Sequence, residues 1–260
     1  MAATVGRMQD WLDTGLGLIY PEACQLCRKQ RATLPEGFVC AACRADVHFI
    51  SPPFCERCGL PFTGDLAATF ECSNCRELEL YFRFARAAVI SKTVVREAVH
   101  RFKYSRALWF ENFLAGLLLP EAAPVLNKKD WDFIVPVPLH PLKKREREFN
   151  QAGILGRRLA EETQIPLNDK ILERIVPTTT QTLLTREKRA ANMKDAFAVR
   201  HGIRLEGKRI VVLDDILTTG ATTNACARAL RGARGGCDRR LCLDSCPRTL
   251  NNLESWQPHF

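Results

Sequence analysis

One stretch decides the fold of this chain: residues 210–222, which read Ile-Val-Val-Leu-Asp-Asp-Ile-Leu-Thr-Thr-Gly-Ala-Thr. The continuous aliphatic run predicts a buried strand over residues 209–213, and the residues after it predict a helix over 222–234. Two carboxylates, Asp214 and Asp215, end the strand, and a turn of small residues leads into the helix. Ligands of open α/β sheets bind beyond the carboxyl ends of the strands. The stretch therefore predicts a ligand site at that edge.

The residue types indicate the ligand. A small-residue turn that enters a helix aims backbone N–H groups at one point, which suits a phosphate. Gly220 permits close approach, and Thr218, Thr219 and Thr222 supply hydroxyl donors. The two carboxylates would repel a phosphate but suit sugar hydroxyls. A ribose phosphate carries both groups and so suits both the turn and the carboxylates. The stretch is neither a Walker A loop nor a dinucleotide fingerprint. The alternative is a strand that ends in a solvated acidic turn.

Flanking segments predict a sheet with helices. An apolar stripe at Val95, Ala98, Val99 and Phe102 predicts a helix over 94–104, and further helices are expected over 109–118, ending before Pro120, and 150–163. Short strands are expected over 132–137 and within 239–245. Strands that alternate with helices predict an α/β fold, with a mostly parallel sheet covered on both faces.

Cysteines mark a separate N-terminal module. Eight of the 12 cysteines form four Cys-x-x-Cys pairs, separated by near-equal gaps. Two such pairs complete a tetrahedral four-sulfur shell for Zn²⁺. We expect two consecutive ribbons with these ligands: Cys24, Cys27, Cys40 and Cys43 in the first, and Cys55, Cys58, Cys72 and Cys75 in the second. Spacing alone leaves an interleaved pairing open, and the alternative to metal is a set of buried or redox-active thiols.

A closed four-cysteine shell has no open position, so both Zn²⁺ ions are expected to be structural, contributing about 10 kcal/mol to folding. His48 follows the second pair, and we interpret it as a surface or packing residue because eight cysteines already fill two shells. The remaining cysteines lack the paired spacing and are interpreted as small core residues rather than a third metal site: Cys226, Cys237, Cys242 and Cys246.

Charge divides the chain in the same place. Residues 1–80 carry 7 Lys/Arg against 10 Asp/Glu, whereas the remainder carries 31 against 19, a net charge of +12. A basic domain favours phosphate-bearing partners, although plain solubility also uses surface charge. Asp10 and Asp13 interrupt the stretch where a secretory signal would be apolar, and no apolar run is long enough to span a bilayer. We expect a cytosolic protein without membrane insertion.

Several motifs together resemble the ComF family, whose members join a cysteine-rich ribbon to a type I phosphoribosyltransferase domain. The motifs are 102–104, 136–140, 145–151, residues 181–197 with Gln181, Leu184, Arg189, Asn192 and Phe197, and the 210–222 stretch itself, which resembles the binding motif for phosphoribosyl pyrophosphate (PRPP). The resemblance implies a double zinc ribbon over 1–82 and a phosphoribosyltransferase-like domain over 83–260. One departure is Glu148, where the family commonly has glycine, and it bears on the local loop geometry.

The resemblance also implies a reaction: transfer of a phosphoribosyl group from PRPP with release of pyrophosphate, assisted by Mg²⁺. Asp214 and Asp215 would hold the ribose hydroxyls and, through water, the metal. The candidate PRPP-binding residues are Thr218, Thr219, Gly220, Ala221, Thr222, Arg145, Arg147, Arg186, Lys188 and Arg189. Each of the basic ones has the alternative of a solvated surface charge, and His140 is either a proton donor or a structural residue.

The acceptor of such a transfer is not evident, because no segment is identifiable as a base-recognition region. Binding of PRPP without catalysis therefore stays open. The family resemblance implies a second role in DNA uptake and natural transformation, with single-stranded DNA and other competence proteins as partners. A basic domain with a phosphate cradle suits that role.

Overall fold

The computed structural model describes residues 22–62, 72–77, 79–176, 195–217, 219–233 and 250–251. Several predicted features lie outside these ranges: Thr218, the basic residues Arg186, Lys188 and Arg189, the strand expected within 239–245, and Cys237, Cys242 and Cys246.

Two parallel strands form the centre of the α/β domain. The strands β1 (Phe133–Pro136) and β4 (Ile210–Leu213) pair in parallel, with Phe133 opposite Ile210 and Pro136 opposite Leu213. Ile134 also forms a parallel bridge with Leu167. Farther along the chain, β5 (Ile216–Leu217) pairs in parallel with β6 (Leu250–Asn251), and β2 (Leu172–Arg174) pairs antiparallel with β3 (Phe197–Val199). Both predicted strands, 132–137 and 209–213, are confirmed.

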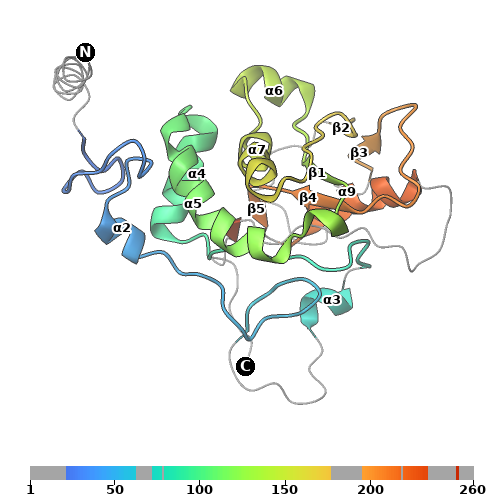
Figure 1. The fold of residues 1–260 in the computed structure, drawn as a ribbon, viewed down its shortest axis with the longest axis horizontal. Coiled ribbons are helices and arrows are strands. Elements are labelled where there is room, and N and C mark those ends of the chain that lie inside the picture. The colour runs from blue at the N-terminus through green and yellow to red at the C-terminus, as the bar shows by residue number, and fades with distance from the viewer. Residues whose placement is uncertain are drawn as a thin grey trace, which may run out of the picture.

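Alternate side chains of this parallel pair enter two different buried clusters. Ile134, Val211 and Leu213 pack with the helices α4 (Thr93–Tyr104), α5 (Glu111–Ala122) and α7 (Gln151–Thr163). Val135 and Val212 pack on the other face with α9 (Ala221–Gly232) and with β2 and β3. Strand side chains alternate between faces, so an unbroken aliphatic run buries both. The α/β fold with a sheet covered on both faces is thereby confirmed (Figure 1).

The helical predictions hold closely, with one correction. The buried residues of α4 are the four of the predicted stripe, and α7 and α9 lie within one or two residues of their expected bounds. The expected helix over 109–118 was misplaced, because α5 runs over 111–122 and contains Pro120 in its last turn. Proline removes one backbone donor there, and burial of Ala122 keeps the turn helical. No helix in the described ranges is long and apolar enough to cross a bilayer.

Helix α6 (Pro141–Arg147), which joins β1 to α7, was not predicted from the sequence. It is short, mostly charged and buries none of its residues, so it has no apolar stripe to reveal it. His140 caps its start, because its Nδ1 accepts a hydrogen bond of 3.3 Å from the Leu142 N–H. This contact gives His140 a structural role.

The two ribbons dock on opposite sides of the sheet. The first, with α2 (Ala41–Ala45), packs through Val39 on the cluster of α4 and α5, and a side chain at Gly37 would clash with the α5 backbone at Phe113. The second, with α3 (Ser73–Glu77), contributes Cys58 and Cys72 to the cluster of α9. Figure 1 shows α2 and α3 at separate places around the domain. The domain boundary between residues 82 and 83 stays a prediction.

Glu148 occupies the position at which the family resemblance leads one to expect glycine. It is the C-cap of α6 and has φ +67°, a left-handed conformation that favours glycine, and its N–H donates to the Lys144 carbonyl at 2.8 Å. Its carboxylate lies 3.1 Å from the Arg106 guanidinium, an exposed ion pair. The turn therefore forms with glutamate, at the cost of backbone strain.

This strain predicts that Glu148→Gly is more stable than Glu148→Ala. Both variants lose the ion pair, but only glycine relieves the left-handed residue, which costs an L-amino acid about 1 kcal/mol. Urea unfolding of both variants beside the unmodified chain measures the difference. Equal stability of the two variants would contradict a left-handed cap at residue 148.

Candidate functional site

The eight paired cysteines form two separate clusters, in the consecutive pairing. In the first, the Sγ atoms of Cys24 and Cys43 lie 3.8 Å apart and those of Cys27 and Cys40 lie 3.7 Å apart. In the second, both closest Sγ pairs are at 3.6 Å, Cys55 with Cys75 and Cys58 with Cys72. Within each cluster all four sulfurs lie within 4.8 Å of one another. The interleaved alternative is excluded.

These distances fit Zn²⁺. A tetrahedral shell with Zn–S bonds of about 2.3 Å separates its sulfurs by about 3.8 Å. Each cluster supplies four sulfurs and so leaves no position for a substrate, which makes both sites structural. His48 belongs to neither cluster: it is exposed and its Nδ1 lies 3.0 Å from the Asp46 carbonyl oxygen.

The predicted acidic pair lies where β4 ends. The Asp215 N–H donates to Asp214 Oδ1 at 2.9 Å, and the Asp215 carboxylate meets Lys103 of α4, with Nζ to Oδ2 at 2.8 Å. Both side chains of that ion pair are largely buried, with 15% and 12% exposed. Lys103 was not among the predicted site residues, although the motif 102–104, which carries part of the family resemblance, contains it.

The environment of Asp214 disfavours its charge. Burial and the neighbouring Asp215 carboxylate raise the pKa of Asp214 well above its usual range, although Lys103 lowers it. A cation at this place would restore the ionised form. Two carboxylates suit a hard divalent ion such as Mg²⁺, so Asp214 and Asp215 are the residues that would hold it.

Arginines from two other elements belong to this region, and one of them, Arg174, lies near Asp214. Arg147 of α6 stacks over the Tyr104 ring at 4.8 Å and donates to Gln151 Oε1 at 3.4 Å. Arg174 of β2 is close enough to Asp214 for its charge to raise the arginine pKa, although burial, the larger effect, lowers it. Gln151, at the start of α7, is 1% exposed, and within the described ranges its Nε2 has no hydrogen-bond partner. Arg174 is positioned by the pairing of β2 with β3, which comes much later in the chain, so no local pattern indicates it.

The small-residue turn comes after the two acids and leads into α9. Thr219 and Gly220 precede α9, Gly220 has φ +77° and is its N-cap, and Thr219 Oγ1 accepts a long hydrogen bond of 3.4 Å from the Ala221 N–H. The first turn of this 12-residue helix thus presents backbone donors and a positive dipole end. Thr222 lies half-buried in that turn.

Of the predicted ligand-binding residues, the structure assembles most at the carboxyl edge of β1 and β4: Asp214, Asp215, Arg147, Thr219, Gly220, Ala221 and Thr222. Arg145 is exposed on α6. One expectation needs correction: the chain does not turn directly from the acids to the helix, because Ile216 and Leu217 first form β5.

The chain is similar to several known proteins. Residues 15–76 match the family described as "Double zinc ribbon domain". Over 75% of its length the chain is 28% identical to "Competence protein F" of Haemophilus influenzae, covering 91% of that protein. It is 28% identical over 82% of its length to "DNA utilization protein YhgH" of Escherichia coli, covering 92% of it, and 26% identical over 75% to "Competence protein ComFC" of Bacillus subtilis, covering 79% of it.

The resemblance to the ComF family is confirmed. Among solved structures, the chain is similar to an adenine phosphoribosyltransferase from Leishmania donovani, at 13% identity and a TM-score of 0.33, over 60% of this chain and 70% of that one. That likeness is too low to bear on the reaction.

The raised pKa of Asp214 predicts a pH-dependent gain in stability for Asp214→Asn. Between the ordinary aspartate pKa of about 3.9 and the raised value, the folded chain holds a proton that the unfolded chain has released, so stability falls as pH rises. The variant escapes this loss. Its melting temperature should exceed that of the unmodified chain by about 2–4 °C at pH 8 and match it at pH 4.

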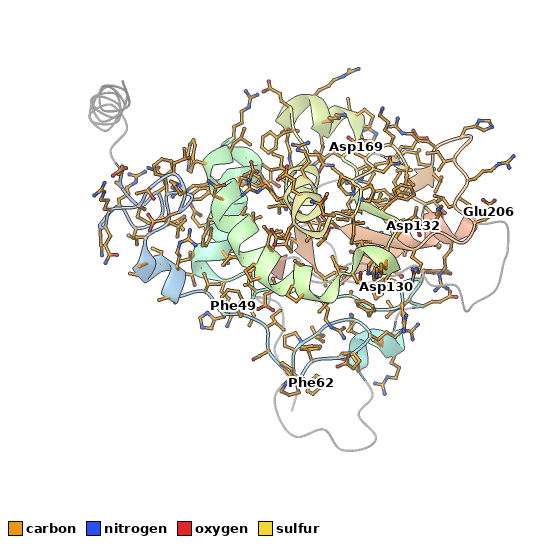
Figure 2. The ribbon with its side chains drawn as sticks, viewed as in Figure 1. Phe49, Phe62, Asp130, Asp132, Asp169 and Glu206 are labelled. Carbon is orange, nitrogen blue, oxygen red and sulfur yellow. The ribbon has the colours of Figure 1, made fainter. Side chains whose placement is uncertain are left out.

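Asp132→Asn is the control with the opposite sign. Asp132 lies near Asp130 at the amino end of β1 (Figure 2). Burial raises its pKa, but the hydrogen bond from the Arg209 N–H and the ion pair with Lys208 lower it by more. That contribution to stability is present above about pH 4 and lost as pH falls, so this variant should be less stable at pH 8. Equal responses of the two variants would contradict the assignment.

Proposed function

We propose that the chain binds PRPP at the carboxyl edge of β1 and β4, with Mg²⁺. The observation that carries this proposal is the order of groups along the edge: a buried strand, two carboxylates, and a left-handed Gly220 that opens a helix. The helix start suits the 5-phosphate, and the carboxylates suit the ribose hydroxyls.

Each neighbouring group then has a role. Asp214 and Asp215 hold the hydroxyls and the metal, whose charge neutralises the pyrophosphate. Arg147 and Lys103 add positive charge near the leaving group. Lys103 is held by Asp215 at 2.8 Å, so a ligand that engages Asp215 also meets an ordered cation. A phosphoribosyltransferase reaction, with loss of pyrophosphate to an acceptor still to be identified, is the catalytic form of this proposal.

The PRPP site is tested by the double variant Asp214→Asn, Asp215→Asn. Titration calorimetry with PRPP and Mg²⁺ should show binding to the unmodified chain and at least a tenfold loss in the variant, because each hydrogen bond to a charged group is worth about 1.5–3 kcal/mol. Asp132→Asn, at the opposite end of the sheet, should bind as the unmodified chain does. Unchanged affinity of the double variant would dispose of the proposal, and pyrophosphate release would separate transfer from binding.

We propose as a second candidate function the handling of single-stranded DNA in the cytosol, in DNA uptake together with other competence proteins. Helix α6 favours it, because it carries Lys143, Lys144, Arg145 and Arg147 within seven residues. Arg147 stacks on Tyr104, whose side chain is 56% exposed. Cations beside an accessible aromatic ring suit a single strand, which offers phosphates and unstacked bases. The names of two relatives, "Competence protein F" and "DNA utilization protein YhgH", agree with such a role.

Charge reversal on α6 tests this candidate. Lys144→Glu with Arg145→Glu should weaken binding of a fluorescent oligonucleotide and lower the slope of log K against log salt by about 1–2, because each phosphate contact releases counterions. The matched control is Arg28→Glu with Lys29→Glu, two adjacent exposed cations on the first ribbon. Binding that is independent of salt, or that the control weakens equally, would count against α6.

A further inference from the structure

The segment 79–86 follows the second ribbon in the chain and lies against the Cys55–Cys58 knuckle of that ribbon. The Ala85 N–H donates to the Arg57 carbonyl at 2.8 Å, and the Arg57 guanidinium donates to the Leu80 carbonyl at 3.3 Å. A side chain at Gly59 would clash with the Ala85 carbonyl oxygen, so the two backbones are in direct contact. The knuckle that holds Cys55 and Cys58 is therefore fixed to this segment at several points.

The other side of the same segment is bound to the first turn of α9. Asn224 makes both hydrogen bonds: its Oδ1 accepts from the Tyr81 N–H at 2.7 Å, and its Nδ2 donates to the Glu79 carbonyl at 2.8 Å. Residues 79 and 224 are 145 positions apart in the chain. Within α9, the Asn224 N–H donates to the Gly220 carbonyl at 2.8 Å. Asn224 therefore contacts both the segment 79–86 and the small-residue turn before α9.

Apolar packing follows the same route. Phe82 is 2% exposed, and a side chain added at Gly220 would be in ordinary van der Waals contact with its ring. One buried cluster contains Cys58 and Cys72 of the metal site together with Phe82, Leu217 and Ala225. The second metal site therefore shares one core with residues on either side of the turn before α9.

We propose that Asn224 is a positioning residue through which the second zinc site orders the turn 219–222. Zn²⁺ fixes the knuckle, the knuckle fixes segment 79–86, and Asn224 with Phe82 fixes the start of α9. The expected consequence rests on the proposed PRPP function: loss of the zinc from the second site lowers the affinity of the chain for a phosphorylated ligand. By reciprocity, the bound ligand raises the affinity of the second site for zinc.

The first ribbon provides an internal contrast. It packs on α4 and α5, where Arg101 donates to the Gln25 carbonyl at 2.5 Å and Asn112 donates to the Leu34 carbonyl at 2.9 Å. Its buried cluster lies on the other face of the sheet from α9. Loss of the first zinc should therefore loosen α4 and α5 and leave the start of α9 ordered.

Asn224→Ala tests the proposal in the full-length, zinc-loaded chain. It should keep two zinc ions, yet its amides in 79–86 and 220–226 should exchange hydrogen about tenfold faster, because local opening becomes easier. Its affinity for PRPP with Mg²⁺ should fall about fivefold or more. Asn127→Ala is the matched control, since Asn127 Oδ1 accepts one backbone hydrogen bond in a surface turn before β1. Unchanged exchange in Asn224→Ala overturns the proposal.

A thermodynamic cycle separates positioning from general destabilisation. Cys75→Ser removes a ligand of the second site, and Cys27→Ser removes one of the first; both cysteines are half-buried. The double variant Asn224→Ala, Cys75→Ser should bind PRPP no more weakly than Cys75→Ser alone, and only Cys75→Ser should speed exchange at 220–226. Additive losses, or equal exchange in both cysteine variants, overturn the proposal. If Cys75→Ser does not fold, Asn224→Ala decides.

The two proposals fail in different ways. If the unmodified chain does not bind PRPP while Asn224→Ala still speeds exchange at 220–226, the PRPP function is wrong and the positioning role stands. If the chain binds PRPP and Asn224→Ala binds it equally well, the function stands and the positioning role is wrong.

Discussion

The parallel pairing of β1 with β4 is the constraint on which the rest of the structure depends. Both strands are buried on both faces, so their backbone groups have to bond to each other. The pairing continues one residue past the strands, where the Val137 N–H donates to the Leu213 carbonyl at 2.8 Å. The chain beyond β1 supplies α6 and the start of α7, and the chain beyond β4 supplies the two acids and the turn before α9. Segments some 75 positions apart therefore meet at one edge.

The electrostatics of that edge follow from mixing charges of both signs in a partly buried place. The Asp215 carboxylate disfavours the charge of Asp214, whereas Lys103 of α4 forms an ion pair with Asp215 and Arg174 of β2 lies near Asp214. The edge therefore carries charges of both signs. A ligand that carries both phosphates and hydroxyls complements such a mixture, and a divalent ion would complete it. The proposed PRPP function rests on this mixture of charges, which a bare phosphate would complement less fully.

The zinc ribbons are parts of the same folded body. Each ribbon is too small to bury a core alone, and each adds its apolar residues to one of the two clusters that flank the sheet. The segment 79–86 includes the predicted boundary between residues 82 and 83, yet it is bonded to the Cys55–Cys58 knuckle and to α9 together. A boundary drawn from composition therefore falls within a structural connection. The proposed link between metal binding and the order of the turn 219–222 rests on this connection.

The sequence by itself determined the elements with a local or periodic signal: four cysteine knuckles, two strands, the buried stripe of α4, and the order of acids, small residues and helix after β4. Helix α6 was not predicted because it buries none of its residues. The predicted end of α5 was too early because the helix continues through Pro120 to the buried Ala122, despite the loss of one backbone donor. Only the tertiary structure decided which knuckles pair, which cations reach the acids, and that Asn224 contacts Glu79 and Tyr81. These depend on contacts between residues far apart in the chain, and spacing or periodicity within one segment carries no information about them.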